Sequence, residues 1–273
     1  MRSLGTLARS AILGALDKVV GWKPYLLLAS DDGTGRTYVQ VCDDLNVFGK
    51  SLRVIYENVR QYSRWRELQN AKKEPETINW IRSLPSDTVL YDIGANVGNY
   101  SLLAKLLNPT AQVLAFEPEP SSFAALCRTI ALNQMDIRPF CFALSDTTGV
   151  GTLNLSRFGV GHSDHQLNRS INQSGDQFQS TFSVGVGQYA VDDLVERFGL
   201  PVPTHIKIDV DGIEALVIAG MKRMLGDSKV REVAIELSND AEFSACHAIL
   251  SAHGFDCGYA AFESSRKMYF YKR

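Results

Sequence analysis

Short apolar runs alternate with amphipathic segments along most of the chain, and their spacing predicts the elements of the fold. Val89–Ile93 is rich in apolar and β-branched residues between polar turns, which is typical of a strand buried on both faces. From residue 86 onward, such runs alternate with stretches whose apolar positions follow helical spacing. The pattern predicts strands at 89–93, 112–116, 138–144, 151–155, 205–209 and 232–237, helices at 98–107, 118–133, 191–198, 211–221 and 241–253, and a closing hairpin of 255–262 with 267–271.

This order of elements predicts an α/β fold. Strands that alternate with helices form a doubly wound, mostly parallel sheet, here of seven strands, and the final hairpin places antiparallel pairing at one edge. We therefore expect one domain at residues 86–273. Residues 1–85 are expected to form a mainly helical cap or docking region, with the boundary in the turn at 85–87.

The first 85 residues give a weaker signal. Apolar positions from Leu4 to Val19 recur at helical spacing, and this segment is too short and too interrupted to span a bilayer. Packing on the body or on a second copy of the chain is favoured, and contact with a membrane surface is the alternative. Residues 37–41 alternate like a strand, 43–46 resemble a turn, and 75–84 resemble a helix between prolines.

Composition excludes some classes of partner. The formal net charge is −2, so nothing indicates nucleic-acid binding. The five cysteines are scattered without a C-x-x-C pair, which argues against a zinc site or a disulfide framework and favours a reducing compartment. We therefore expect a cytoplasmic protein, with peripheral membrane contact left open.

Two glycines four residues apart, Gly94 and Gly98, follow the first strand of the domain, and a helix follows them. Strand, glycine turn and helix begin a nucleotide-binding βαβ unit. The G-x-x-x-G spacing differs from the G-x-G-x-x-G that cradles a dinucleotide pyrophosphate. Asp92, at the end of the strand, would repel a pyrophosphate but attract the ammonium and sulfonium of S-adenosylmethionine. An NAD-dependent oxidoreductase is therefore disfavoured.

A second acid, Glu117, closes the next strand. A carboxylate at that strand end is placed to bind both ribose hydroxyls of an adenosine. The mundane alternative is an ordinary βαβ turn whose acids cap helices. Strand, turn, helix, strand and acid occur in the order that a nucleotide site requires, which favours the functional interpretation.

Five motifs, in order along residues 86–260, resemble those of the FkbM family of S-adenosylmethionine-dependent methyltransferases. They are Asp92–Tyr100, Phe116–Pro118, Ala143–Asp146, Val191–Leu194 and Ile206–Glu214. Asp211 stands where the family more often has glutamate. The resemblance implies a Rossmann-like class I methyltransferase that methylates hydroxyls of sugars, glycans and secondary metabolites. A non-catalytic module that binds S-adenosylmethionine or a nucleotide remains the alternative.

The predicted site has a cofactor half and a catalytic half. The cofactor residues are Asp92, Gly94, Ala95, Asn96, Gly98, Asn99, Tyr100, Glu117, Pro118, Ser145, Asp146 and Asp209. The catalytic candidates are Asp209, Lys207, Glu236, His162 and His165. Lys207 lies in an apolar strand and therefore needs a carboxylate partner, and either histidine could act as a base near neutral pH.

Two further hypotheses concern the catalytic half. Asp209, Asp211 and Glu236 follow or close adjacent strands and are candidate ligands for a divalent cation such as Mg²⁺. The polar stretch at 156–183 is long for a loop inside a compact domain, which predicts a lid over the acceptor. The sequence does not identify that acceptor, a small molecule or a glycan.

Overall fold

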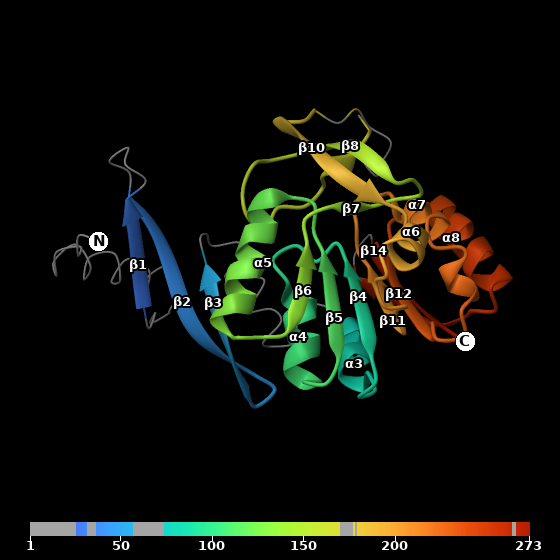
Figure 1. Cartoon of the computed structure of the whole chain (residues 1–273), viewed down its shortest axis with the longest axis horizontal. Coiled ribbons are helices and arrows are strands. Elements are labelled where there is room, and N and C mark those ends of the chain that lie inside the picture. The colour runs from blue at the N-terminus through green and yellow to red at the C-terminus, as the bar shows by residue number, and fades with distance from the viewer. Residues whose placement is uncertain (1–25, 32–36, 57–73, 170–176, 178, 264–265) are drawn as a thin grey trace.

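The computed structural model describes residues 26–31, 37–56, 74–169, 177, 179–263 and 266–273. A seven-stranded sheet at its centre has the order β13-β14-β12-β11-β4-β5-β6 (Figure 1). The bounds are β4 Val89–Ile93, β5 Gln112–Phe116, β6 Ile137–Phe140, β11 His205–Ile208, β12 Glu232–Leu237, β13 Asp256–Glu263 and β14 Arg266–Lys272.

The strand pairing confirms the predicted sheet. β6, β5, β4, β11 and β12 pair in parallel, and β14 pairs antiparallel with both β12 and β13. The order of the strands reverses between β4 and β11, which lie side by side. In an open α/β sheet, ligands bind at the carboxyl ends of strands beside such a reversal.

Helices cover both faces of the sheet (Figure 1). On one face lie α3 Pro75–Ser83, α4 Asn99–Leu107 and α5 Pro120–Leu132, whose buried side chains share a core with Leu90 and Val113. The other face carries α6 Val191–Glu196, α7 Glu214–Ala219, the 3-10 turn η1 Met224–Gly226 and α8 Asp240–Ala252, packed against Tyr91 and Ile93. β4 supplies apolar side chains to both cores, as expected for a strand buried on both faces.

The part of the N-terminal region that the structure describes does not match the prediction of a mainly helical cap. β1 Leu26–Asp31, β2 Thr37–Val47 and β3 Lys50–Tyr56 form an antiparallel three-stranded sheet, and the next element that the structure describes is the helix α3. The turn predicted at 43–46 is wrong, because β2 continues through it. The amphipathic helix predicted for residues 4–19 lies outside the described residues.

A smaller sheet, of order β7-β10-β8-β9, lies above the carboxyl ends of β4, β5 and β6 (Figure 1). It consists of β7 Ala143–Leu144, β8 Gly149–Leu155, β9 Gln166–Leu167 and β10 Phe182–Tyr189. The long loop predicted at 156–183 is therefore interrupted by β9, and its last residues belong to β10. Residues 170–176 and 178 lie outside the described part.

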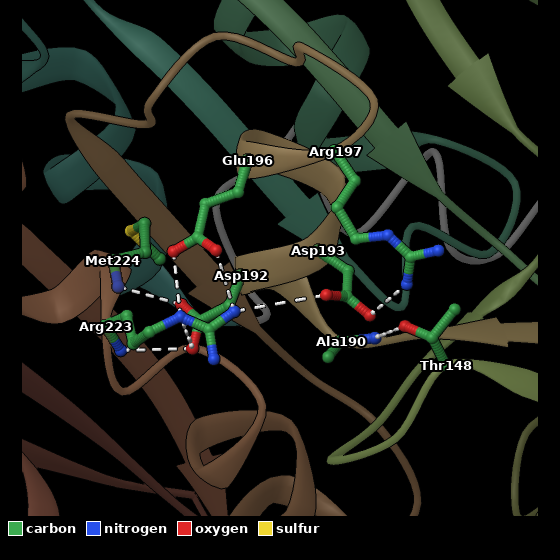
Figure 2. Close-up of polar contacts among 8 residues, drawn as sticks. All are labelled: Thr148, Ala190, Asp192, Asp193, Glu196, Arg197, Arg223 and Met224. Carbon is green, nitrogen blue, oxygen red and sulfur yellow. Dashed lines mark hydrogen bonds and ion pairs between the residues drawn. The ribbon is translucent and has the colours of Figure 1, made fainter.

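Asp192, on the first turn of α6, links this helix to the start of η1 (Figure 2). This buried carboxylate accepts hydrogen bonds from the backbone N–H groups of Arg223, at 3.1 Å, and Met224, at 2.8 Å. Arg223 also pairs with Glu196 at 2.8 Å, on the exposed side of the helix. Since its bonds to backbone are buried, we expect Asp192 to stabilise the fold more than the exposed ion pair does.

Among the helices that the structure describes, none has the length and apolar character needed to cross a lipid bilayer.

Candidate functional site

A cavity of about 350 Å³ opens at the carboxyl ends of β4, β5, β11 and β12. Its lining comes from the central sheet, the smaller sheet, the loop between β8 and β9, and the residue before α3. The lining residues are Glu74, Ile93, Gly94, Asn96, Phe116, Glu117, Pro118, Phe142, Ala143, Leu144, Leu153, His162, Ser163, His165, Leu167, Asp209, Val210, Asp211, Ile213 and Glu236. The volume lies within the usual range for a small-molecule site.

The turn after β4 brings the sheet backbone to the cavity. Gly94 and Gly98 have φ values of 82° and 90°, which favour glycine. A Cβ on Gly94 would lie 1.9 Å from the Asp209 carbonyl oxygen, and one on Gly98 would lie 2.3 Å from Leu126 Cδ1. The glycines therefore allow the turn to pack against β11 and α5.

Glu117 lies at the end of β5, 6% exposed, and lines the cavity. Its Oε2 accepts the Asn96 backbone N–H at 2.7 Å, and its Oε1 accepts the Glu119 backbone N–H at 2.7 Å. Burial outweighs these two hydrogen bonds and raises the pKa of Glu117 to about 8. Each oxygen keeps a further lone pair, so the fixed carboxylate can accept hydrogen bonds from two neighbouring hydroxyls of a ligand.

Asp92 lies behind the glycine turn and is absent from the cavity lining. Its side chain is buried, and its Oδ2 accepts the Ser101 hydroxyl at 2.5 Å. Burial raises the pKa of Asp92, although the charge of Lys207 opposes that effect. Asp92 is therefore buried beneath the cavity lining, and its role toward the donor stays a prediction.

Lys207 and Asp209 confirm the expected pairing of the strand lysine with a carboxylate. Lys207 is 1% exposed, and its Nζ lies 2.8 Å from Asp209 Oδ2 and 4.6 Å from the centre of the Tyr100 ring. Burial lowers the pKa of Lys207, but the charges of Asp209, Asp92 and Glu74 outweigh it and hold that pKa above its usual range. Lys207 is therefore a permanent cation beneath the cavity, and it orients Asp209.

The candidate cation ligands do not form a metal site. Asp209 and Glu236 line the cavity, but Asp209 is paired with Lys207, and Asp211 Oδ2 accepts the His165 backbone N–H at 2.9 Å. Within the described ranges, no group of three or more metal-ligating side chains is arranged to hold a cation. The structure therefore gives no support to the Mg²⁺ hypothesis.

The segment between β8 and β9 covers the cavity. Asn96 Nδ2 donates to the His162 carbonyl at 2.9 Å, and the Gly161 N–H donates to Ser122 Oγ at 3.1 Å. Asp211 holds the same segment through the His165 N–H. Both predicted histidines line the cavity from this side, and the function of the segment as an acceptor lid stays a prediction.

Of the remaining predicted residues, only Pro118 is among the lining residues of the cavity. Ala95 is buried in the core, Asn99 begins α4, and Pro118 lines the cavity beside Glu117. Ser145 is buried and Asp146 is exposed, and neither is among the lining residues. Their neighbours Ala143 and Leu144 line the cavity instead.

Sequence reasoning missed Glu74. This residue precedes α3, lines the cavity and is 6% exposed. In the sequence it resembles any acid before a proline that begins a helix, and only its spatial position sets it apart.

Comparison with known proteins gives a family match and several relatives. Residues 92–259 match the methyltransferase FkbM domain. The hexuronic acid methyltransferase AglP of Haloferax volcanii is 27% identical over 192 residues, 70% of this chain and 72% of that protein. The 31-O-demethyl-FK506 methyltransferase FkbM of Streptomyces tacrolimicus is 28% identical over 63% of this chain and 73% of that protein. The 2-O-methyltransferase NoeI of Sinorhizobium fredii is 33% identical, covering 56% and 64%.

Proposed function

The chain belongs to the FkbM methyltransferase family, and from that premise we propose that it transfers a methyl group from S-adenosylmethionine to a hydroxyl of a sugar, a glycan or a secondary metabolite. The named relatives support this kind of acceptor, because their names specify a hexuronic acid, a 2-O position and the 31-O position of FK506. In the chain itself, the observation that carries the proposal is the position of Glu117, a fixed carboxylate at a strand end inside the cavity.

The donor half of the cavity is formed by Glu117, Gly94 and Asn96. Glu117 would accept the two ribose hydroxyls, and the turn from Gly94 to Asn96 would contact the donor through its backbone. Asp92 would act on the positive end of the donor from below the turn, through its charge. Once bound, S-adenosylmethionine supplies a methyl group that is already activated by the sulfonium.

The acceptor half lies at the ends of β11 and β12. Asp209 would accept a hydrogen bond from a hydroxyl of the acceptor next to the one that is methylated, and the Lys207 ammonium 2.8 Å away holds the carboxylate in one orientation. Glu236, on the next strand, would bind a second polar group of the acceptor. Holding the acceptor oxygen in line with the methyl group is the main task of such a site.

Mass spectrometry of glycans and polar metabolites from cells with and without the protein tests the proposal. We expect one class of molecule to lose the mass of a CH₂ group when the protein is absent, with the methyl group on oxygen. An unchanged set of methylated molecules would contradict the proposal.

Asp209→Asn keeps the volume of the side chain and removes its charge. We expect it to leave the affinity for S-adenosylhomocysteine within a few-fold and to lower turnover by about 10²-fold, the size of loss that a misplaced acceptor can cause. Unchanged turnover would remove Asp209 from the acceptor site. EDTA should leave wild-type activity unchanged, since Lys207 already neutralises Asp209.

A further inference from the structure

Glu74 enters the cavity from outside the matched family domain. It is the residue before α3, 18 positions ahead of the first matched residue, Asp92. Its side chain is 6% exposed and lines the same cavity as Asp209 and Glu117. Its backbone has a φ of 49°, a left-handed conformation that is uncommon for a residue with a Cβ. Such conformations persist where the surrounding structure fixes the residue, and they concentrate at functional sites.

Glu74 is linked to the donor-binding turn through Tyr100. Tyr100 lies two residues after Gly98, on the first turn of α4. Burial, and then the charge of Glu74 and the hydrogen bond between the two side chains, hold the pKa of Tyr100 well above its usual range. The phenol is therefore a donor to the Glu74 carboxylate. The Lys207 ammonium lies over the same ring, so Glu74 and Asp209 flank one Tyr100–Lys207 unit.

Glu74 differs from the other acids and bases of the cavity in what it contacts. Asp209 is paired with the Lys207 ammonium at 2.8 Å. His162 and His165 line the cavity from the segment between β8 and β9, whose backbone is bonded to Asn96 and Asp211. Glu236 lies on β12, which is separated from β4 by β11. Glu74, in contrast, is buried and is hydrogen-bonded to Tyr100, which lies just after the turn from Gly94 to Gly98.

We propose that Glu74 is a catalytic residue that receives the proton of the acceptor hydroxyl, an inference that rests on the proposed methyl transfer. The acceptor oxygen forms a bond to the methyl carbon while the bond from that carbon to sulfur breaks, and the sulfur keeps the electron pair. The acceptor O–H bond breaks, and its proton passes to the Glu74 carboxylate. Asp209 and Tyr100 are then positioning residues, which orient the acceptor and the Glu74 side chain respectively.

The test uses the full chain, S-adenosylmethionine with a labelled methyl group, and a polar extract of cells that lack the gene as the source of acceptor. The variants are Glu74→Gln, Glu74→Asp and Glu74→Ala. Glu76→Gln, on the first turn of the same helix and outside the cavity lining, is the matched control. Calorimetry with S-adenosylhomocysteine measures the donor site of each variant separately. Formate is added to Glu74→Ala, because a small carboxylate can occupy the space that the side chain leaves.

We expect Glu74→Gln to bind S-adenosylhomocysteine within twofold of wild type and to lose about 10²-fold or more of the labelled transfer. Glu74→Asp should keep part of the rate, Glu76→Gln all of it, and formate should raise the rate of Glu74→Ala in proportion to its concentration. A purely structural role for Glu74 would give no rescue by formate. Wild-type transfer rates in Glu74→Gln, or the absence of rescue in Glu74→Ala with an intact donor site, would overturn the assignment. If the wild type transfers no label, the proposed function itself fails, and this inference fails with it.

Discussion

We expect the affinity of the protein for adenosine to rise steeply with pH between 6 and 9 because of Glu117. Its pKa is raised to about 8 in the ligand-free protein, chiefly by burial. A carboxylate with both oxygens fixed by backbone N–H groups can accept two ribose hydroxyls, whereas the protonated acid offers one oxygen less as an acceptor. Adenosine therefore binds to the protein in which Glu117 is charged. At a pH below the pKa of Glu117, binding releases a proton from this side chain.

The magnitude follows from the fraction of charged Glu117. With a pKa of about 8, that fraction is about 1% at pH 6 and about 90% at pH 9. An apparent dissociation constant scales inversely with the fraction of the binding-competent form, so the affinity should rise about 90-fold, or about 2.7 kcal/mol, over this range. Above pH 9 the affinity should level off.

Calorimetry with adenosine provides the assay, because adenosine has the ribose hydroxyls but no α-amino group that titrates near pH 8. Repeating each titration in buffers of different ionisation enthalpy measures the proton release. The controls are 2′,3′-dideoxyadenosine, which lacks both hydroxyls, and Glu117→Gln, and both should show weak affinity without the pH slope. A change of less than twofold between pH 6 and 9, or an equal slope for the dideoxy compound, would refute the reasoning.

Three further predictions concern the scaffold of the site. Gly98→Ala should lower the free energy of unfolding in urea by about 1–3 kcal/mol more than Gly49→Ala. Both glycines have a positive φ, but only a Cβ on Gly98 would clash with a neighbour, Leu126. Equal losses for the two variants would show that the clash relaxes. Asp192→Asn should cost about 1–3 kcal/mol in the same assay, because it weakens the bonds to two backbone N–H groups, and a loss below 0.5 kcal/mol, the usual range for a surface substitution, would contradict this. Asn96→Gly permits the local φ of 52° but removes the hydrogen bond to the His162 carbonyl, so limited proteolysis should cut residues 156–165 faster than in wild type. Unchanged cleavage would show that the bonds at Gly161 and His165 are enough to hold this segment.

The sequence predicted the central sheet because its signals are local. Apolar runs mark strands such as Val89–Ile93, and the strands, the glycine turn and Glu117 follow one another within 30 residues. Of the N-terminal strands, only the start of β2, at 37–41, was predicted. The rest of β2 was missed although a period of two is present, with Leu45 and Val47 buried on either side of exposed Asn46. Polar residues within β2 resemble a turn, and the burial of alternate residues emerges only when the strand packs on the domain.

The sequence predicted those residues of the candidate site that stand at the end of a predicted strand. Asp209 and Glu117 belong to this group. Glu74 does not, since its contact with Tyr100 joins residues 26 positions apart and depends on how α3 packs beside α4. For Asp92, the motif does not reveal the hydrogen bond from Ser101 that holds the buried carboxylate in place.

The central claim is that the cavity between the glycine turn and Glu117 binds S-adenosylmethionine. Calorimetric titration of the wild type and of Glu117→Ala with S-adenosylhomocysteine and with NAD tests it most directly. We predict micromolar binding of S-adenosylhomocysteine to the wild type, binding weaker by about 1–3 kcal/mol in Glu117→Ala because a charged hydrogen-bond acceptor is lost, and no detectable heat from NAD. Heat from NAD with none from S-adenosylhomocysteine would contradict the claim.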